Sequence, residues 1–233
     1  SSTSRGLGDV YKRQAEATGT ATISATLASA ADIAITIPLV ATGSATSGTD
    51  YTAINSISIS AGSTTGTGTF TPTNDSHYDA STNETAIFTI GTNGQGYCIG
   101  ETRSVTASIV DDETAPTLSL ATSAASIAED AGSAITLTAT LSNATYADVT
   151  VTLDTTGTAT SGSDYTAVAS NVTISAGSRS GTTTFTPTND TMYETATAET
   201  AIIAVSDVTG GSATESGIQS QTILITADSD AAV

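Results

Sequence analysis

The sequence is poor in basic residues and contains no long apolar run. Only five of its 233 residues are Lys or Arg, against 23 Asp or Glu, which gives a formal net charge of −18 at pH 7. A surface with that charge repels nucleic acid and anionic membranes. No apolar run approaches the ~20 residues that a membrane-spanning helix needs. We therefore expect no nucleic-acid partner and no direct membrane insertion by this chain.

Cysteine and aromatic residues are also scarce. Cys98 is the only cysteine, so no disulfide can form within the chain. A nucleophilic Cys98 would need a base, for which His77 is the only histidine, and an incidental thiol is the simpler interpretation. Tryptophan is absent, and three Phe and seven Tyr make up the aromatics. The core therefore has to be built from Ala, Val, Ile, Leu and Thr, and the β-branched members of this set favour strands.

The acidic surplus leaves two interpretations open. A surface with so many carboxylates attracts cations, which makes a metal ion the natural partner. Acidity also keeps a protein soluble in a salty or secreted setting, and that role requires no specific ligand.

The first fourteen residues differ in charge from the rest of the chain. They carry Arg5, Lys12 and Arg13, which leaves two basic and 22 acidic residues in residues 15–233. The segment SSTSRGLGDVYKRQ also resembles adapter-derived leaders at the ends of metagenomic assemblies. We therefore expect residues 1–14 to be a non-native leader, with a native basic arm as the alternative.

An internal repeat divides the rest of the chain. Residues 43–53 return as residues 157–167 with an offset of 114, and residues 69–75 return as residues 184–190 with an offset of 115. Repetition at this length predicts two domains, residues 15–114 and 115–233, that belong to a longer array. The opening strand of the second copy has its counterpart inside the leader, so we expect the first domain to lack its first strand.

Alternation of apolar and polar residues predicts short strands. In the first copy it predicts a strand over residues 33–37. For the second copy we expect strands over residues 117–121, 135–141, 149–153, 171–175, 181–186, 200–206 and 221–226. About seven short strands per copy indicate an all-β fold of two tandem immunoglobulin-like antiparallel β-sandwiches.

Four motifs occur in the same order in both copies. In the second copy they are Ala-Glu-Asp-Ala-Gly, Gly-Thr-Ala-Thr-Ser-Gly-Ser-Asp-Tyr, Ile-Ser-Ala-Gly with Phe-Thr-Pro-Thr-Asn-Asp, and a terminal acidic cluster. This order resembles the Calx-β repeat. The resemblance implies a β-sandwich that binds calcium among the loops at one end. It also implies a setting such as a sodium–calcium exchanger, an integrin subunit or a large bacterial surface protein.

The resemblance implies a set of carboxylate ligands in each copy. In the second copy they are Glu129, Asp164, Asp190, Glu194, Glu199, Asp228 and Asp230. In the first copy they are Glu16, Asp50, Asp75, Asp79, Glu84, Asp111, Asp112 and Glu113. The family often has consecutive Asp residues where this chain has Asn74-Asp75 and Asn189-Asp190, so each site has one carboxylate fewer. We expect weak binding, with dissociation constants of roughly 0.1 to 1 mM.

Calcium chemistry fits these residue types without the family. Calcium takes about six to eight hard oxygen ligands in a flexible geometry. Carboxylates that the fold brings together repel one another, and they must then be protonated or bind a cation. The alternative is that the same Asp, Gly, Ser and Thr residues only form turns.

Several functions are compatible with these patterns. The leading hypothesis is a non-catalytic, calcium-stiffened repeat of an extracellular or cell-surface, adhesin-like protein, whose partners are calcium and neighbouring repeats. A module that recognises a surface glycan or protein through its loops is the second hypothesis, and a calcium sensor of a membrane protein is the third. An enzyme is disfavoured because the first copy has His77 where the second has Met192.

Overall fold

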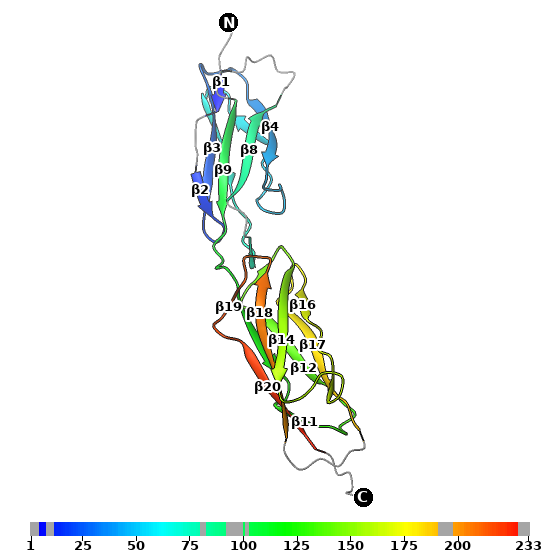
Figure 1. Cartoon of the computed structure of the whole chain (residues 1–233). Helices are drawn as coiled ribbons and strands as arrows, with labels where there is room; N and C mark the ends of the chain where they lie inside the picture. The colour runs from blue at the N-terminus through cyan, green and yellow to red at the C-terminus, as the bar shows by residue number, and fades with distance from the viewer. Residues whose placement is uncertain are drawn as a thin grey trace, which may run out of the picture. The chain divides into compact units, whose positions relative to one another are not determined.

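The computed structural model of the chain describes residues 5–7, 12–79, 83–91, 100, 103–190 and 198–227. The chain divides into a first unit, Ser1–Asp75 with Ser81–Asp112, and a second unit, Ser76–Ala80 with Glu113–Val233. Within the described residues, all regular secondary structure is β-strand (Figure 1). The predicted all-β class, with two immunoglobulin-like sandwiches in tandem, is confirmed. No helix in the described ranges is long and apolar enough to cross a membrane.

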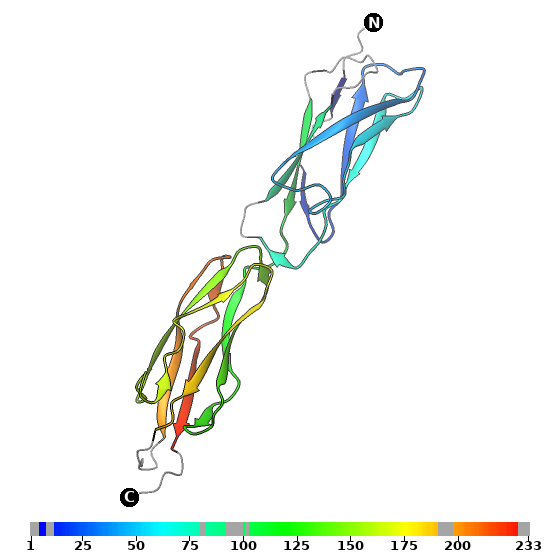
Figure 2. The same cartoon turned by 90° about the vertical axis from the view of Figure 1, so that its right-hand side faces the viewer.

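The second unit is a sandwich of two five-stranded sheets, whose layers are seen in Figure 2. Its strands are β7 (His77–Tyr78), β10 (Thr117–Thr122), β11 (Ser126–Ala128), β12 (Ile135–Leu141), β13 (Ala144–Thr145), β14 (Val149–Gly157), β15 (Tyr165–Thr166), β16 (Asn171–Ile174), β17 (Ser180–Pro187), β18 (Glu199–Thr209), β19 (Thr214–Glu215) and β20 (Ser220–Thr226). One sheet has the order β15–β17–β12–β10–β19 and the other β11–β20–β18–β14–β16. The short strands β7 and β13 form a separate parallel pair.

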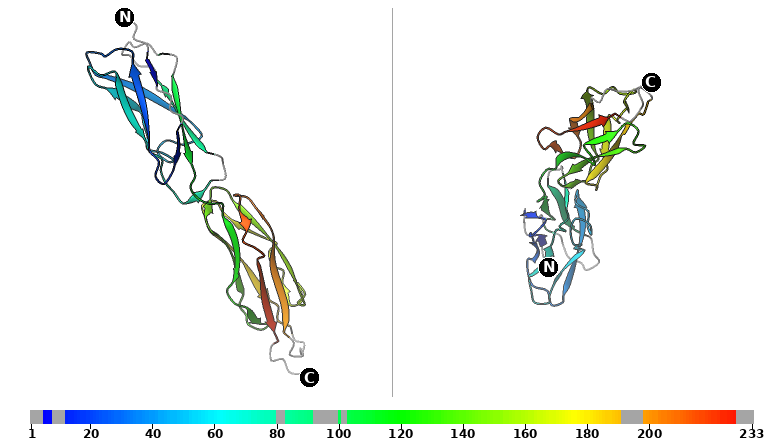
Figure 3. Two further views of the ribbon diagram at one scale, coloured as in Figure 1. Left: turned by 90° about the vertical axis from the view of Figure 1, so that its left-hand side faces the viewer. Right: turned by 90° about the horizontal axis from the view of Figure 1, so that it is seen from below.

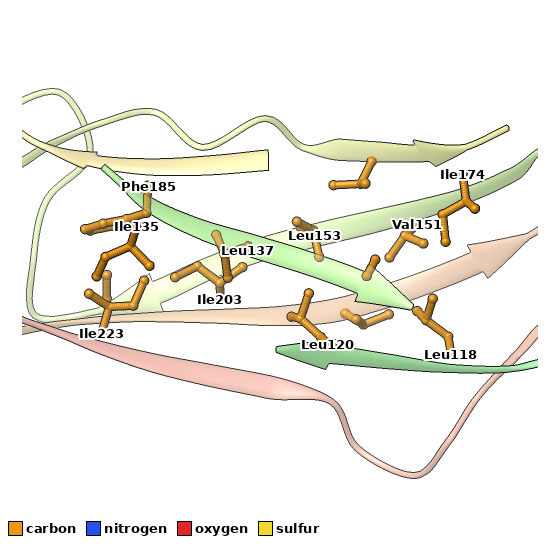
Figure 4. Packing of buried hydrophobic residues seen from close by; sticks show 14 of the residues in the cluster. Leu118, Leu120, Ile135, Leu137, Val151, Leu153, Ile174, Phe185, Ile203 and Ile223 are labelled. Atoms are coloured by element: carbon orange, nitrogen blue, oxygen red, sulfur yellow. The ribbon is translucent and has the colours of Figure 1, made fainter. Parts of the chain in front are cut away.

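The core of the second unit is the apolar set that the alternation predicts. Side chains from both sheets point toward each other in Figure 4, with Leu137 and Ile203 near the middle. Phe185 is fully buried, and its ring is stacked on that of Tyr165 at a centroid distance of 4.9 Å. These two rings are the only aromatic side chains in the described core of this unit, and the remaining members are aliphatic.

All seven strands expected in the second copy are present, and they differ from the prediction mainly in length. β14 runs on to Gly157 and β18 to Thr209. Their pairing shifts register between Thr152 and Leu153, which marks a β-bulge. The extra residue is Ser206 of β18, so the strict period of two on which the prediction rests is lost beyond it in that strand.

The first unit repeats this arrangement, which Figure 3 shows from the opposite side to Figure 2. Its strands are β1 (Arg5–Leu7), β2 (Lys12–Ala15), β3 (Ala21–Leu27), β4 (Ile35–Gly43), β5 (Ser56–Ile59), β6 (Thr65–Phe70), β8 (Glu84–Ile90) and β9 (Ser104–Val110). The sheets are β1–β3–β6 and β2–β9–β8–β4–β5. Tyr51, Phe70 and Phe88 form a buried cluster, with ring centroids 5.1 to 5.9 Å apart. Ile33 lies outside β4 and is 68% exposed, so the strand predicted from that residue begins two residues later.

Parts of the expected leader pair with the first unit. β1 runs antiparallel to β3, as β10 does to β12, and β2 runs parallel to β9, as β11 does to β20. Residues of the expected leader therefore occupy the places that β10 and β11 have in the second unit, and the absence of a native first strand stays a prediction. A sheet edge offers unpaired N–H and C=O groups to any extended segment, whatever its side chains. That residues 1–14 are non-native remains a proposal.

The outward residues of one strand pair in each unit are uncharged. In the second unit, Thr136, Thr138 and Thr140 face outward from β12, and their partners on β17 are Thr184, Thr182 and Ser180. In the first unit the outward pairs of β3 and β6 also consist only of Ser and Thr. In the described part of the chain most acidic residues lie in loops or at strand ends, with Asp154 in β14 and Asp207 in β18 as exceptions.

Candidate metal centre

Two glutamates enter the second unit from neighbouring strand ends. Glu199 is the first residue of β18 and pairs with Ile225 of β20. Ile225 pairs on its other side with Ile127 of β11, and Glu129 follows two residues later. Alternation places Glu129 on the same, inward face as Ile127, and Glu129 is only 5% exposed. Its amide donates a 3.0 Å hydrogen bond to the carbonyl of Thr226.

The first unit contains the same arrangement. Glu84 is the first residue of β8 and pairs with Ile109 of β9, which pairs on its other side with Gln14 of β2. Glu16 follows two residues after Gln14, and its amide donates a 3.2 Å hydrogen bond to the carbonyl of Val110. Two copies with different flanking residues thus place a pair of glutamates in equivalent positions.

Three carboxylates of the first copy lie close together. One oxygen atom from each of Glu16, Asp112 and Glu113 lies within 4.8 Å of the others. Asp112 and Glu113 follow the end of β9, next to the strand end from which Glu16 projects. Glu16 and Glu113 are partly buried and Asp112 is exposed. Three anionic oxygen donors at this separation repel one another unless a cation or protons neutralise them.

The strand register changes one equivalence between the copies. Ile109 and Ile225 occupy the same position in the sheet, so Asp112 corresponds to Asp228. The residue in the place of Asp111 is then Ala227, and not an acidic residue. Matching the acidic residues by order alone pairs Asp111 with Asp228. By strand register Asp111 has no acidic counterpart, so the terminal cluster of the second copy has one carboxylate fewer.

The central aspartates close turns. The Oδ2 atom of Asp164 accepts a 2.5 Å hydrogen bond from the amide of Thr160, and Asp50 and Thr46 make the same bond at 2.5 Å. The backbone of the loop is held as well, because the amide of Gly162 donates to the carbonyl of Tyr165 at 2.8 Å. The turn function, the alternative to calcium at these positions, is therefore present. Whether Asp50 and Asp164 also bind a metal stays a prediction.

Replacing Asp164 by alanine should lower the free energy of unfolding of the second unit by about 1 to 2 kcal/mol, since an amide loses its charged acceptor. This loss should already be present in chelator, because it comes from the turn, and a further loss in calcium is expected if Asp164 is also a ligand. Urea unfolding in both buffers measures it. A loss that appears only in calcium would contradict the turn role and show that Asp164 acts as a ligand alone.

The other expected ligands fall into three groups. Asp75 and Asp190 follow their strands in the same local geometry, since the side-chain amide of Asn74 or Asn189 donates to the next carbonyl at 3.1 or 3.2 Å. Asp79 belongs to the segment that groups with the second unit. The expected ligands Glu194, Asp228 and Asp230 lie outside the described residues, and so does Cys98.

Sequence reasoning missed the hydroxyl groups next to the paired glutamates. Thr158 and Thr200 exchange three hydrogen bonds beside Glu199, and Ser44 and Thr85 contact each other beside Glu84. Gly-Ser-Ala in the first copy and Gly-Thr-Ala in the second occupy equivalent places in the repeat, but the sequence alone predicts only turns there.

The donor set fits a hard divalent cation. All the converging groups are carboxylates, and calcium prefers such oxygen ligands and tolerates irregular geometry. Softer metals prefer His or Cys. Among the described residues, the group of Glu16, Asp112 and Glu113 contains neither.

Fold and site together define a tandem β-sandwich protein with a candidate cation site at the strand ends. The Calx-beta domain family model matches residues 9–113 and 111–230. The chain belongs to the Calx-beta domain family, as its motifs predicted.

Several solved structures resemble the chain at low identity, while none of the curated proteins matches it. CBD12 from CALX1.2 has a TM-score of 0.42 and 14% sequence identity, over 95% of this chain and 99% of that one. The calcium binding domain CBD12 of CALX1.1 has a TM-score of 0.42 and 11% identity over the same shares. The adhesin InvE of Yersinia pseudotuberculosis has a TM-score of 0.34 and 13% identity, over 96% of this chain and 58% of that one.

Proposed function

We propose that the chain is a non-catalytic, calcium-binding pair of repeats from a large extracellular or cell-surface protein of the adhesin type. The observation that carries the proposal is the convergence of Glu16, Asp112 and Glu113 within 4.8 Å in a domain of the Calx-beta family. Its partners would be calcium ions, neighbouring repeats of the same chain, and a glycan or protein on another surface.

Repetition supports a structural role. Two copies in tandem add length, and both place glutamates at equivalent strand ends. A single active cleft would not need to be duplicated in this way. The paired glutamates at the strand ends suit a module that binds cations at its ends.

Calcium would also stiffen the array. Asp112 and Glu113 immediately precede Thr114, whose carbonyl accepts a 2.8 Å hydrogen bond from Asn143. A cation bound by Asp112 and Glu113 would therefore restrict the backbone just before Thr114, which the hydrogen bond from Asn143 already fixes. If small-angle scattering gives the same maximum dimension in calcium and in chelator, this part of the proposal is wrong.

Isothermal titration calorimetry of the full chain with calcium tests the proposal. We expect saturable binding with dissociation constants of roughly 0.1 to 1 mM, the range of extracellular calcium modules. Magnesium, which demands a smaller and more regular site, should bind more weakly. Absence of saturable binding in the millimolar range would contradict the proposal and leave the carboxylates as turn and surface residues.

A further inference from the structure

The Gly-Thr-Ala stretch at the end of β14 clamps the residue that follows Glu199. The amide of Thr200 donates to Oγ1 of Thr158 at 2.9 Å, and the amide of Thr158 donates to Oγ1 of Thr200 at 3.2 Å. The amide of Ala159 donates to the carbonyl of Thr200 at 3.0 Å. All three polar groups of Thr200 therefore take part in bonds to two consecutive residues.

Close approach of the two backbones requires the glycine. Gly157 has a φ of +128°, and a Cβ on it would lie 2.0 Å from the carbonyl oxygen of Thr200. Only glycine adopts this conformation without strain, and a side chain here would push the clamp apart. The glycine of the motif thus lets the two backbones come close together, and the next residue places its hydroxyl at that point.

The first unit repeats the clamp with a different side chain. The amide of Thr85 donates to Oγ of Ser44 at 2.9 Å, and the amide of Ala45 donates to the carbonyl of Thr85 at 3.0 Å. Gly43 has a φ of +117°, and its Cβ would also lie 2.0 Å from a carbonyl oxygen, that of Thr85. Serine and threonine share only the hydroxyl, which can accept one hydrogen bond and donate another.

The clamp acts directly on the peptide unit of the glutamate. The amide of Thr200 lies in the same planar peptide unit as the Cα and carbonyl of Glu199. Fixing that amide therefore fixes the start of the Glu199 side chain, which faces inward beside Ile225. The hydroxyl of Ser44 does the same for Glu84, beside Ile109.

We propose that the hydroxyls of Thr158 and Ser44 are positioning groups, which hold Glu199 and Glu84 in the orientation that binds calcium. This inference rests on the proposed function and deepens it. It assigns the Gly-Thr-Ala motif a role in metal affinity. The simpler alternative is that the motif only stabilises the fold. Loss of groups that orient metal ligands typically weakens binding by about 10- to 100-fold.

The test uses the full chain in three paired variants. Thr158→Val with Ser44→Ala removes both hydroxyls and keeps similar shapes. Thr158→Ser with Ser44→Thr exchanges the residues between the units and keeps both hydroxyls. Thr138→Val with Thr67→Val removes two hydroxyls from the outer faces and is the control. Calorimetric titration with calcium gives the affinity, and amide hydrogen exchange in chelator reports the protection of Thr200 and Thr85.

The proposal expects the dissociation constants of the first pair to rise about tenfold, with faster exchange at Thr200 and Thr85. The exchanged pair and the control should match the unmodified chain. Unchanged affinity with a lower melting temperature in chelator would overturn the positioning role and leave the proposed function intact. No calcium binding by the unmodified chain would overturn both. Should the double variant not fold, Ser44→Ala alone, at an exposed position, should weaken one of the two sites, and unchanged binding would again overturn the proposal.

Discussion

Replacing Tyr165 by alanine should lower the free energy of unfolding of the second unit by about 3 to 5 kcal/mol. The side chain is 4% exposed, and its ring is stacked on that of Phe185. Its removal deletes apolar burial, leaves a cavity and breaks an aromatic pair. Small domains are stable by only about 5 to 15 kcal/mol, so the variant should be close to unfolding at room temperature. Urea unfolding measures the loss.

The Tyr165→Phe variant is the matched control, because it keeps the ring and removes only the hydroxyl. It should lose less than about 1.5 kcal/mol. The first unit is an internal reference, since its own cluster around Tyr51 is unchanged. A loss below about 1 kcal/mol for alanine, too small for a buried aromatic, would show that this ring contributes little to the core.

Replacing Glu129 by glutamine should abolish most of the calcium-linked stability of the second unit. At a hundredfold excess over the dissociation constant, a bound ion stabilises the folded state by about 2.7 kcal/mol. Glu129 is nearly buried at the strand end where Glu199 begins β18, so its carboxylate is a central ligand in the proposed site. In chelator the same variant should be at least as stable as the unmodified chain, because a buried charge has been removed.

Asp130→Asn is the control for that prediction, since it removes the same charge from the adjacent, exposed residue. It should keep the calcium effect. Glu16→Gln should produce the equivalent loss in the first unit, where Glu16 is one of three converging carboxylates. Thermal unfolding in chelator and in calcium measures all three. If Glu129→Gln melts like Asp130→Asn in both buffers, Glu129 is not a ligand.

The long strands could be predicted because one face of each is buried. Leu118 and Leu120, or Val149 and Val151, alternate with polar residues and reach the core as expected. The two- and three-residue strands such as β11, β15 and β19 could not be predicted, since they are too short to show a period. Backbone pairing at a sheet edge depends on geometry and not on side-chain type.

The candidate site was predictable in its residue types and less so in its geometry. The repeated order of the acidic motifs singled out Glu16, Asp112 and Glu113, which the structure brings together. The turn formed by Asp164 was one of two interpretations, and only the structure shows the bond to Thr160. The equivalence of Asp112 with Asp228 needs the strand register, which the spacing of acidic residues alone does not determine.

The hydroxyl clamp was hidden for a similar reason. Thr158 and Thr200 lie 42 residues apart, and they meet only because β14 and β18 are neighbours in one sheet. In a chain so rich in threonine, neither residue stands out until the pairing is known. The chemistry that positions a ligand can therefore be less visible in sequence than the ligand itself.

Thermal unfolding of the full chain in excess chelator and then in millimolar calcium, with magnesium as the control ion, tests the central claim most directly. A calcium-binding pair of Calx-beta domains should melt at a clearly higher temperature in calcium, with a smaller shift in magnesium, because the ion binds only the folded state. Identical melting in all three buffers would contradict the account. The β-sandwiches would stand, and the acidic clusters would serve only turns and solubility.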